Sequence, residues 1–175
     1  QHGVKGATNR QIAEEANVTA AMVHYYFKNK DALHLGVLEF AFAPLLTTLT
    51  GITTLESWVI NFHQHLTERP WLPHLMIREV LPLNGQLRPL FIKHFAPQIF
   101  GSIKAMVAKE AELRKVPQGF DIERHIVLLM GMLVYPFMSM EIAQDLTGRK
   151  FDAPMFTGFR DDALRLFCQG IAARD

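Results

Sequence analysis

The spacing of apolar residues constrains the fold of this chain more than any other feature of its sequence. Apolar side chains recur at intervals of three and four residues along most of the chain, as at Leu55, Val59 and Phe62. This spacing gathers them on one face of a helix that has 3.6 residues per turn. We find no convincing alternation of apolar and polar residues, the pattern of a half-buried strand. The sequence therefore predicts an all-α fold.

Glycine and proline divide this helical pattern into segments. Breaks occur at Gly51, at Pro70 and at Pro117, among other places. The first two segments are short and only three residues apart, whereas the later ones are mostly long and more apolar. This difference predicts two domains, residues 1–36 and residues 37–175. We expect helices over residues 9–16, 20–27, 31–49, 54–68, 73–81, 86–114, 121–146 and 156–173.

Composition limits the classes of protein to which the chain can belong. With 175 residues, 49% of them hydrophobic, it can build a core without a metal or a disulfide. Its single cysteine, Cys168, excludes an internal disulfide and fits a reducing compartment, so we expect a cytoplasmic protein. The longest uncharged apolar run, residues 126–140, is shorter than the ~20 residues of a membrane span, so we expect no membrane insertion. The net charge of +1 does not by itself indicate a nucleic-acid partner.

The sequence lacks the short motifs of common enzymes and metal proteins. It contains no HExxH or CxxC motif, no EF-hand loop, no GxSxG elbow and no glycine-rich phosphate loop. His63 and His65 lie two apart, so on a helix they point about 200° away from each other and cannot hold one ion together. We therefore expect neither an enzyme nor a protein that carries a metal or another cofactor.

The two short helices near the start have the features of a helix-turn-helix motif. Thr8 and Gln11 have the spacing of a capping box at the start of the first helix. Two helices that cross steeply need a small residue where they approach, which Ala13 provides. Asn17 tolerates the left-handed backbone that the corner requires. Thr19 is a good N-cap for the second helix. This pattern is typical of a helix-turn-helix.

The second of these helices is expected to turn a flat face outward. If Val23, Tyr26 and Phe27 form its apolar side, Met22 lies at the edge and smaller or polar residues point away. Small side chains let a helix enter the major groove deeply, and nearby lysines suit phosphates. The alternative is a helical hairpin that packs inside a larger domain and never meets DNA. The residues expected to point outward are Ala20, Ala21, His24 and Tyr25, followed by Lys28 and Lys30.

A family resemblance now becomes specific. The runs TNRQIAEEANVT (residues 8–19) and HYYFKNKDAL (residues 24–33) resemble the DNA-binding domain of the TetR family of bacterial transcriptional regulators. The resemblance covers about residues 3–37, and beyond it only the helical architecture agrees. It implies a homodimeric, ligand-responsive regulator, usually a repressor, that binds double-stranded DNA at a palindromic operator. A helical scaffold or interaction module that keeps the fold without binding DNA is the alternative.

The resemblance also assigns roles to residues. His24 stands where the family usually has Tyr, and Asn17 where it usually has Gly; both can do the same physical job, and His24 could add a dependence on pH. Arg10 matches a position that reaches a base or a phosphate. The positions that face bases match Ala20, Met22 and Tyr25. The positions that hold phosphates match Thr19, His24, Tyr26 and Lys30, the last of which also fixes the start of the connecting helix.

The family pattern begins with a helix that this sequence does not contain in full. In related proteins that helix supports the helix-turn-helix, and Gln1, His2 and Gly3 resemble only its last turn, with Gly3 as the capping glycine. We therefore expect about 15 further residues, one helix of usual length, before Gln1.

The C-terminal helices are expected to pair two subunits. Residues 126–138 are apolar around the whole helix, so more than one side must be covered. The last helix has an apolar stripe with small residues, and two such helices from each subunit would make a four-helix interface. The alternative is that all of these residues belong to the core of a monomer. The residues expected at the interface are Ile126, Leu133, Phe159, Ala163, Phe167 and Gly170.

The same part of the chain is expected to enclose an effector. Pro44, Pro97 and Pro136 fall inside helical patterns, where each bends its helix and can leave a void between helices. Aromatic and methionine side chains would give such a void a mostly apolar wall for a small molecule. The alternative is that these side chains are ordinary core. The residues expected to line the site are Phe62, Met76, Phe95, Phe100, Met130, Tyr135 and Met138.

Overall fold

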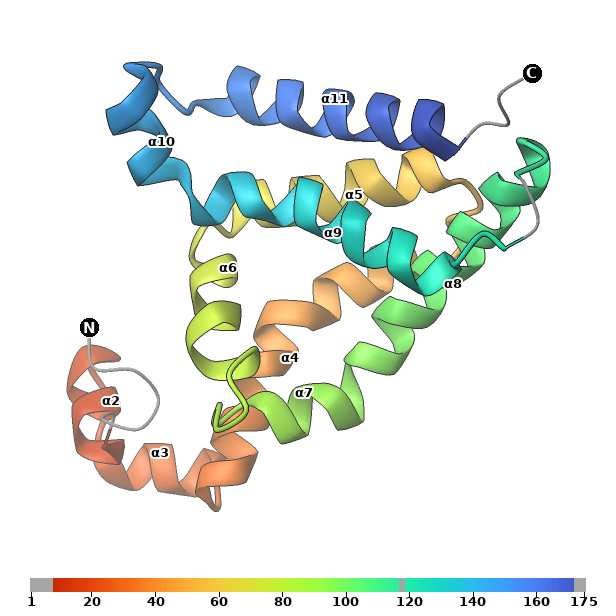
Figure 1. The fold of residues 1–175 in the computed structure, drawn as a ribbon. Coiled ribbons are helices and arrows are strands. Elements are labelled where there is room, and N and C mark those ends of the chain that lie inside the picture. Colours follow the sequence, from red (N-terminus) through yellow and green to blue (C-terminus); the bar gives the residue numbers. More distant parts are fainter. Residues whose placement is uncertain (1–7, 117–118, 172–175) are drawn as a thin grey trace. The chain divides into compact units, whose positions relative to one another are not determined.

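A computed structural model of the protein describes residues 8–116 and 119–171. These residues form helices and connecting turns, with no strand among them, so the predicted all-α fold is confirmed. The expected last turn of a preceding helix at residues 1–3, and the end of the last predicted helix at residues 172–173, lie outside the described residues. The elements, in order (Figure 1), are α2 (Asn9–Glu15), α3 (Ala20–Tyr26), α4 (Lys30–Leu49), α5 (Leu55–Glu68), α6 (Trp71–Leu75), the π-helix η1 (Met76–Val80), α7 (Arg88–His94), α8 (Ala96–Leu113), α9 (Ile122–Met138), α10 (Met140–Thr147) and α11 (Ala153–Ile171).

Two of the predicted long helices are each divided in two. The segment expected as one helix over residues 86–114 breaks at Phe95, because Pro97 lacks an N–H and its ring would collide with a carbonyl four residues earlier. Pro97 instead occupies the first turn of α8, where a helix tolerates proline. The segment expected over residues 121–146 breaks at Ser139, three residues after Pro136, and α10 turns by 70° from α9. The predicted continuity of both segments is therefore wrong.

The chain forms two compact units. The first unit contains Gln1–Pro44 and Leu75–Pro97, and the second contains Leu45–His74 and Gln98–Asp175. The prediction of domains over residues 1–36 and 37–175 divides the chain by function rather than by compactness, and it stays a prediction.

The core of the first unit joins α4 to α7. Leu38 and Ala41 are fully buried on α4. The ring of Phe42, also on α4, lies 5.1 Å from the ring of Phe91 and 5.7 Å from the ring of Phe95, between centroids. Offset aromatic rings at these distances pack favourably beyond the area that they bury. This cluster anchors the first half of α4, which follows directly on α3.

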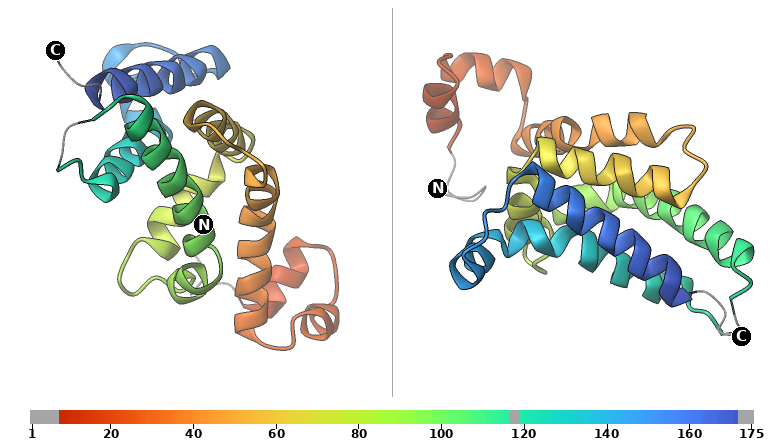
Figure 2. Two further views of the ribbon diagram at one scale, coloured as in Figure 1. Left: turned by 90° about the vertical axis from the view of Figure 1, so that its right-hand side faces the viewer. Right: turned by 90° about the horizontal axis from the view of Figure 1, so that it is seen from above.

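The core of the second unit is built where α11 packs against α9 and α5 (Figure 2). Leu129 on α9 and Trp58 on α5 have no exposed surface. The Trp58 indole N–H donates to Ser102 Oγ of α8 at 2.9 Å, so its one polar atom is satisfied in the interior. These contacts leave the opposite sides of α9 and α11 uncovered within the chain.

Two described segments pass a length-and-hydropathy test for a membrane span. One is α4, a third of whose apolar window is buried. The other is the pair α9 and α10, and only if the two bent helices are counted as one span. Because core helices of soluble proteins pass the same test, this is weak evidence for a membrane segment, and the expected absence of one stays a prediction.

Candidate nucleic-acid interface

The helices α2 and α3 both begin at a threonine cap. The Gln11 N–H donates to Thr8 Oγ1 at 3.2 Å, and the Thr8 N–H donates to Gln11 Oε1 at 2.9 Å. At the start of α3 the Met22 N–H donates to Thr19 Oγ1 at 3.2 Å. These bonds satisfy amide groups that the start of a helix leaves without partners. The caps predicted at Thr8 and Thr19 are confirmed.

The turn between α2 and α3 depends on Asn17. Its φ of +53° is left-handed, a conformation that asparagine adopts more readily than most residues with a side chain. The next residue, Val18, donates its N–H to the Ala13 carbonyl at 2.9 Å, which ties the turn to α2. Ala13 is 2% exposed, and α2 packs against α3. The conformation predicted for Asn17 and the small contact residue predicted at Ala13 are both confirmed.

The helix α3 presents an accessible face. Tyr25 is 79% exposed, and Met22, which was expected at the edge of the face, is 45% exposed. Side chains of this kind can lie against base edges in a major groove if nothing in the protein covers them. The structure leaves all the residues predicted to contact DNA exposed, and they are Arg10, Thr19, Ala20, Met22, His24, Tyr25, Tyr26 and Lys30.

Tyr26 differs from its expected place on the apolar side of α3. Its side chain is 70% exposed, whereas Val23 is 6% exposed and Phe27 is half-buried. Val23 and Phe27 lie four residues apart and share a face, whereas Tyr26, the last residue of α3, lies about 100° around the helix from Phe27. Its ring packs edge-on against Tyr25, with centroids 5.6 Å apart. The burial expected for Tyr26 is therefore wrong, and its hydroxyl is accessible.

Two residues that sequence reasoning missed hold α3 to α4. A Cβ placed on Gly36 would lie 2.9 Å from Cε1 of Phe27, so the glycine makes room for the phenylalanine ring against α4. Asn29 caps α4, since its Oδ1 accepts from the Ala32 N–H at 2.8 Å. An asparagine three residues before that amide is a standard N-cap signal that the sequence contained. Together they fix how the outward helix continues into the connector.

Positive groups flank this face. Arg10 Nε donates to Glu14 Oε1 at 2.9 Å, and both side chains are mostly exposed. A surface pair of this kind contributes little, so the guanidinium can exchange Glu14 for a phosphate. Lys28, between α3 and α4, and Lys30, the first residue of α4, are both exposed. The positions of these groups suit the backbone of a duplex rather than its bases.

A buried histidine lies one turn beyond Lys30. His34 is 5% exposed on α4. Burial lowers the pKa of His34 below its ordinary value, and the positive charge of Lys30 lowers it further, while the carboxylates of Asp31 and Glu79 oppose the shift. Burial and Lys30 both favour the neutral ring, so His34 adds no positive charge to the start of α4 at pH 7.

The residues predicted to line an effector site are divided between the two units. Met76 and Phe95 belong to the first unit, and Phe95 packs in its aromatic cluster. In the second unit Phe62 is buried against Trp58, with ring centroids 4.9 Å apart. Helical spacing shows which residues share a stripe but not which stripes meet. Of the remaining predicted residues, all in the second unit, Met130 is half-buried, and Phe100, Tyr135 and Met138 are exposed.

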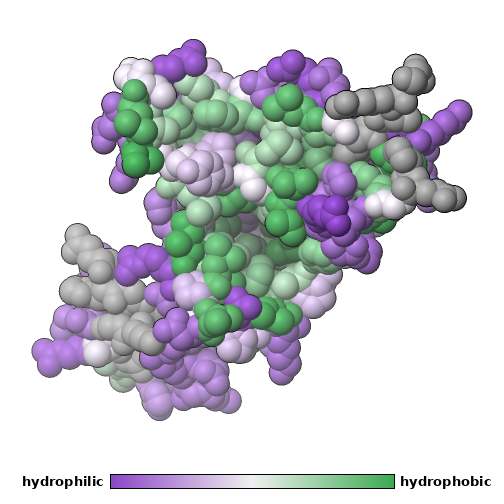
Figure 3. Space-filling view, viewed as in Figure 1, coloured by the Kyte–Doolittle hydropathy of each residue, from purple (hydrophilic) through white to green (hydrophobic). Residues whose placement is uncertain are grey.

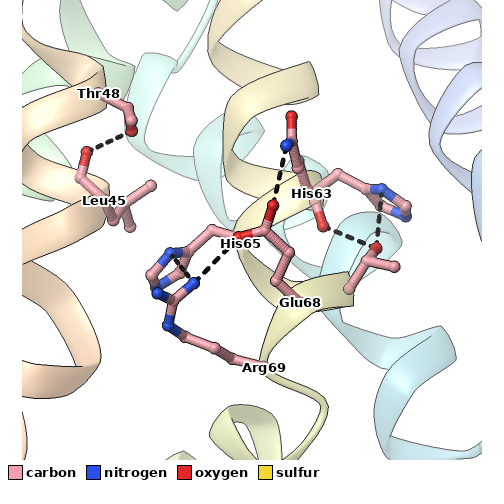
Figure 4. Close-up of polar contacts among 8 residues, drawn as sticks. Leu45, Thr48, His63, His65, Glu68 and Arg69 are labelled. Carbon is pink, nitrogen blue, oxygen red and sulfur yellow. Dashed lines mark hydrogen bonds and ion pairs between the residues drawn. The ribbon is translucent and has the colours of Figure 1, made fainter.

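The histidines of α5 supply a polar group in the core of the second unit. His63 and His65 are 4% and 5% exposed and point to opposite sides of the helix (Figure 4), as their spacing predicts. His63 faces Phe137 of α9, with ring centroids 5.4 Å apart. Its Nε2 makes no hydrogen bond to the described residues. Burial lowers the pKa of His63, and the positive charge of Arg160 lowers it further. Sequence reasoning missed the burial because an apolar-helix pattern gives no sign of it.

Four of the residues predicted at a subunit interface lie inside a single chain instead. Ile126 and Leu133 on α9 are 2% and 1% exposed, and Ala163 and Phe167 on α11 are each 4% exposed. The stripe that they form is the side of each helix that the nearest helices of the same chain cover. Their assignment to a subunit contact is therefore corrected. The other two predicted residues are less buried: Phe159 is half-buried and Gly170 is exposed.

The opposite side of the same helices is apolar and accessible. Leu128 on α9 is 55% exposed, and Leu166 on α11 is 56% exposed. Between them runs a groove of about 310 Å³, which we call the α9–α11 groove. Its walls are formed by His125, Leu128, Met132, Leu166, Phe167 and Gly170. The groove is therefore accessible from solvent.

Comparison with known proteins agrees with this geometry. The family model described as bacterial regulatory proteins, tetR family, matches residues 1–37, which include α2, α3 and the start of α4. No curated protein matches the chain. The match therefore rests on the segment whose caps, turn and outward face are described above.

Proposed function

We propose that this chain, whose residues 1–37 match the family model described as bacterial regulatory proteins, tetR family, is a DNA-binding transcriptional regulator that acts as a homodimeric repressor in the cytoplasm. A small, mostly apolar effector releases it from a palindromic operator. The observation that carries the proposal is the outward face of α3. Tyr25 is 79% exposed on this face, and the helix begins with small residues after the Thr19 cap. A helix with this face can enter a major groove without rearrangement.

Each exposed residue of this region has a role in the proposal. Ala20, Met22 and Tyr25 contact base edges, since all three are exposed on α3. Arg10 reaches a base or a phosphate from α2. The hydrogen-bonding and charged side chains at the ends of α3 position the protein on phosphates, and these are Thr19, His24, Tyr26 and Lys30.

The homodimer is supported by the uncovered apolar side of α9 and α11. Leu128 and Leu166 are exposed there, next to Gly170. Two copies that pair these faces make an isologous interface with two-fold symmetry, which a palindromic operator matches. Its two recognition helices must then lie about 34 Å apart, one turn of DNA.

The effector site is supported by chemistry in the second unit. Phe62 and Met130 supply apolar surface on α5 and α9, and the Nε2 of His63 is a buried polar atom that makes no hydrogen bond to the described residues. A mostly apolar molecule with one hydrogen-bonding group fits this combination. Replacing His63 by Leu, or Tyr135 by Ala, should weaken the response to effector while leaving operator affinity in its absence unchanged. An unchanged response would remove the residue from the site.

Fluorescence anisotropy with labelled palindromic duplexes from DNA next to the gene tests the proposal. Tyr25→Ala should lower the preference for operator over random duplex by about 1–3 kcal/mol, since it removes a base contact. Lys30→Ala should weaken binding to both duplexes alike. It should also reduce the slope of log affinity against log salt concentration by about 1. Lys93→Ala, an exposed lysine of α7, is the control and should change neither. Absence of any salt-sensitive, sequence-selective binding would contradict the proposal and favour a helical scaffold.

A further inference from the structure

The helix α10 carries apolar side chains that its own chain leaves uncovered. None of its residues is buried, and Ile142 and Leu146 are 62% and 80% exposed. These two residues lie four apart and share one face of the helix. The 70° turn after α9 directs α10 away from the axis of α9. Figures 1 and 3 show α10 at one end of the α9 and α11 pair, with hydrophobic surface over it.

The α9–α11 groove lies at the opposite end of the same pair. It involves the first half of α9 and the last turns of α11, whereas α10 follows the end of α9 and precedes α11. With a rise of 1.5 Å per residue, Leu166 lies about 20 Å along the helix from Ala153, where α11 begins. The α10 of a chain therefore does not reach the groove of that chain.

Two-fold symmetry brings these two features together. In the homodimer of the proposed function, on which this inference rests, the symmetry axis crosses the α9 and α11 face and exchanges its two ends. The α10 of each chain then faces the α9–α11 groove of the partner subunit. We propose that α10 is an arm that clasps the partner: Ile142 and Leu146 of each chain insert into the groove of the other.

The charges beside these surfaces favour a second copy as the occupant. Glu141 and Asp145 are exposed on α10 next to the apolar pair. Arg124 lies one turn before Leu128 at the groove, and its side chain is 71% exposed. An acidic residue of the arm can thus pair with Arg124 beside the groove.

Within the chain, Arg124 pairs with Asp121, three residues away. An exposed pair of this kind contributes little, so a carboxylate of the arm can replace Asp121 at small cost.

Disulfide trapping tests the contact directly. In a Cys168→Ser background, Leu146→Cys combined with Gly170→Cys should form a covalent dimer on mild oxidation, and mass spectrometry should find the 146–170 link. The same link within one chain is excluded, because a disulfide spans at most about 7 Å between Cα atoms. Leu83→Cys combined with Gly170→Cys is the control, since Leu83 is 92% exposed but belongs to the other unit, and it should not form this dimer.

Sedimentation of single variants measures how much the arm contributes. Leu146→Glu should raise the dissociation constant of the dimer about tenfold or more, because it places a charge in an apolar groove. Leu83→Glu should leave the constant unchanged. Asp145→Arg should weaken the dimer, and Arg124→Asp added to it should restore part of the loss. Leu83, Arg124, Asp145 and Leu146 are all exposed, so these substitutions should leave the fold of each subunit intact.

The outcomes separate this inference from the homodimer itself. A wild-type chain that sediments as a monomer at all concentrations would overturn both the arm and the homodimer. A wild-type dimer that Leu146→Glu does not weaken, together with no 146–170 link, would overturn the arm alone and leave the homodimer standing.

Discussion

The segment around α2 and α3 differs from the bundle of α5, α9 and α11 in how far apart its interacting residues lie in the sequence. In the first, Thr8, Ala13 and Asn17 shape the motif through neighbours fewer than six residues away. In the second, Trp58 of α5 reaches Ser102, and α11 packs on helices that precede it by tens of residues. The outward face of the first region was correctly expected except at Tyr26. In the second, four residues expected at a surface lie in the core.

Leu133 offers the largest test of this difference. It is 1% exposed on α9, so Leu133→Ala should lower the free energy of unfolding by about 2–5 kcal/mol through lost burial and a cavity. Leu113→Ala, at a leucine of α8 that is 70% exposed, should change it by no more than about 0.5 kcal/mol. Urea unfolding measured at several protein concentrations separates the stability of the subunit from the contribution of subunit association. If Leu133→Ala spared stability but weakened self-association, Leu133 would belong to the subunit contact after all.

Gly36 sharpens the comparison, because this residue of α4 leaves the space that the Phe27 ring, at the end of α3, occupies. Alanine at Gly36 must displace the Phe27 ring, whereas alanine at Gly101, an exposed glycine of α8, meets nothing within 4 Å. The two variants should differ in free energy of unfolding by about 1–3 kcal/mol, with Gly36→Ala the less stable. Gly36→Ala should also reduce operator affinity. Equal stability and equal affinity of the two variants would show that Phe27 and Gly36 do not pack as described.

Asn17 tests the purely local side of the comparison. Its left-handed backbone costs an alanine about 1–2 kcal/mol, so Asn17→Ala should lower the free energy of unfolding by that amount. Asn17→Gly should stay close to the wild type, since glycine adopts this conformation freely. Thermal unfolding followed by circular dichroism measures both. A loss in Asn17→Gly as large as in Asn17→Ala would mean that the asparagine side chain, rather than its backbone, matters.

The smallest expected effect concerns pH and the buried rings of His34 and His63. Burial lowers the pKa of both below the ordinary value of 6.5, so the unfolded chain binds more protons than the folded one as pH falls. Stability is therefore fully present above that ordinary value and declines below it, by at most about 1.4 kcal/mol per pH unit for each ring. His63→Phe keeps a ring against Phe137 and should flatten this decline between pH 7 and pH 5. An unchanged pH dependence in the variant would show that His63 takes no part in it.

The helix breaks show how far local patterns reach. Pro97 and Pro136 were both read as bends inside long helices, and each lies within three residues of a full break. At Pro97 the chain ends α7 and begins α8, with the proline in the first turn. At Pro136 the proline stays inside α9, and the chain turns only at Ser139. The presence of a proline in a helical pattern does not by itself say which of these two outcomes occurs.

By itself, the sequence determined that this chain is helical, where α2 and α3 begin, and that α3 has an accessible face with Tyr25 on it. Caps, turns and helical periodicity depend on bonds and contacts within about five residues, so they can be read directly. Only the tertiary structure decided which side of α9 and of α11 is core, that His63 is buried, and that α10 is exposed. An apolar stripe shows that a helix must be covered, but the helix that covers it comes from a distant part of the chain.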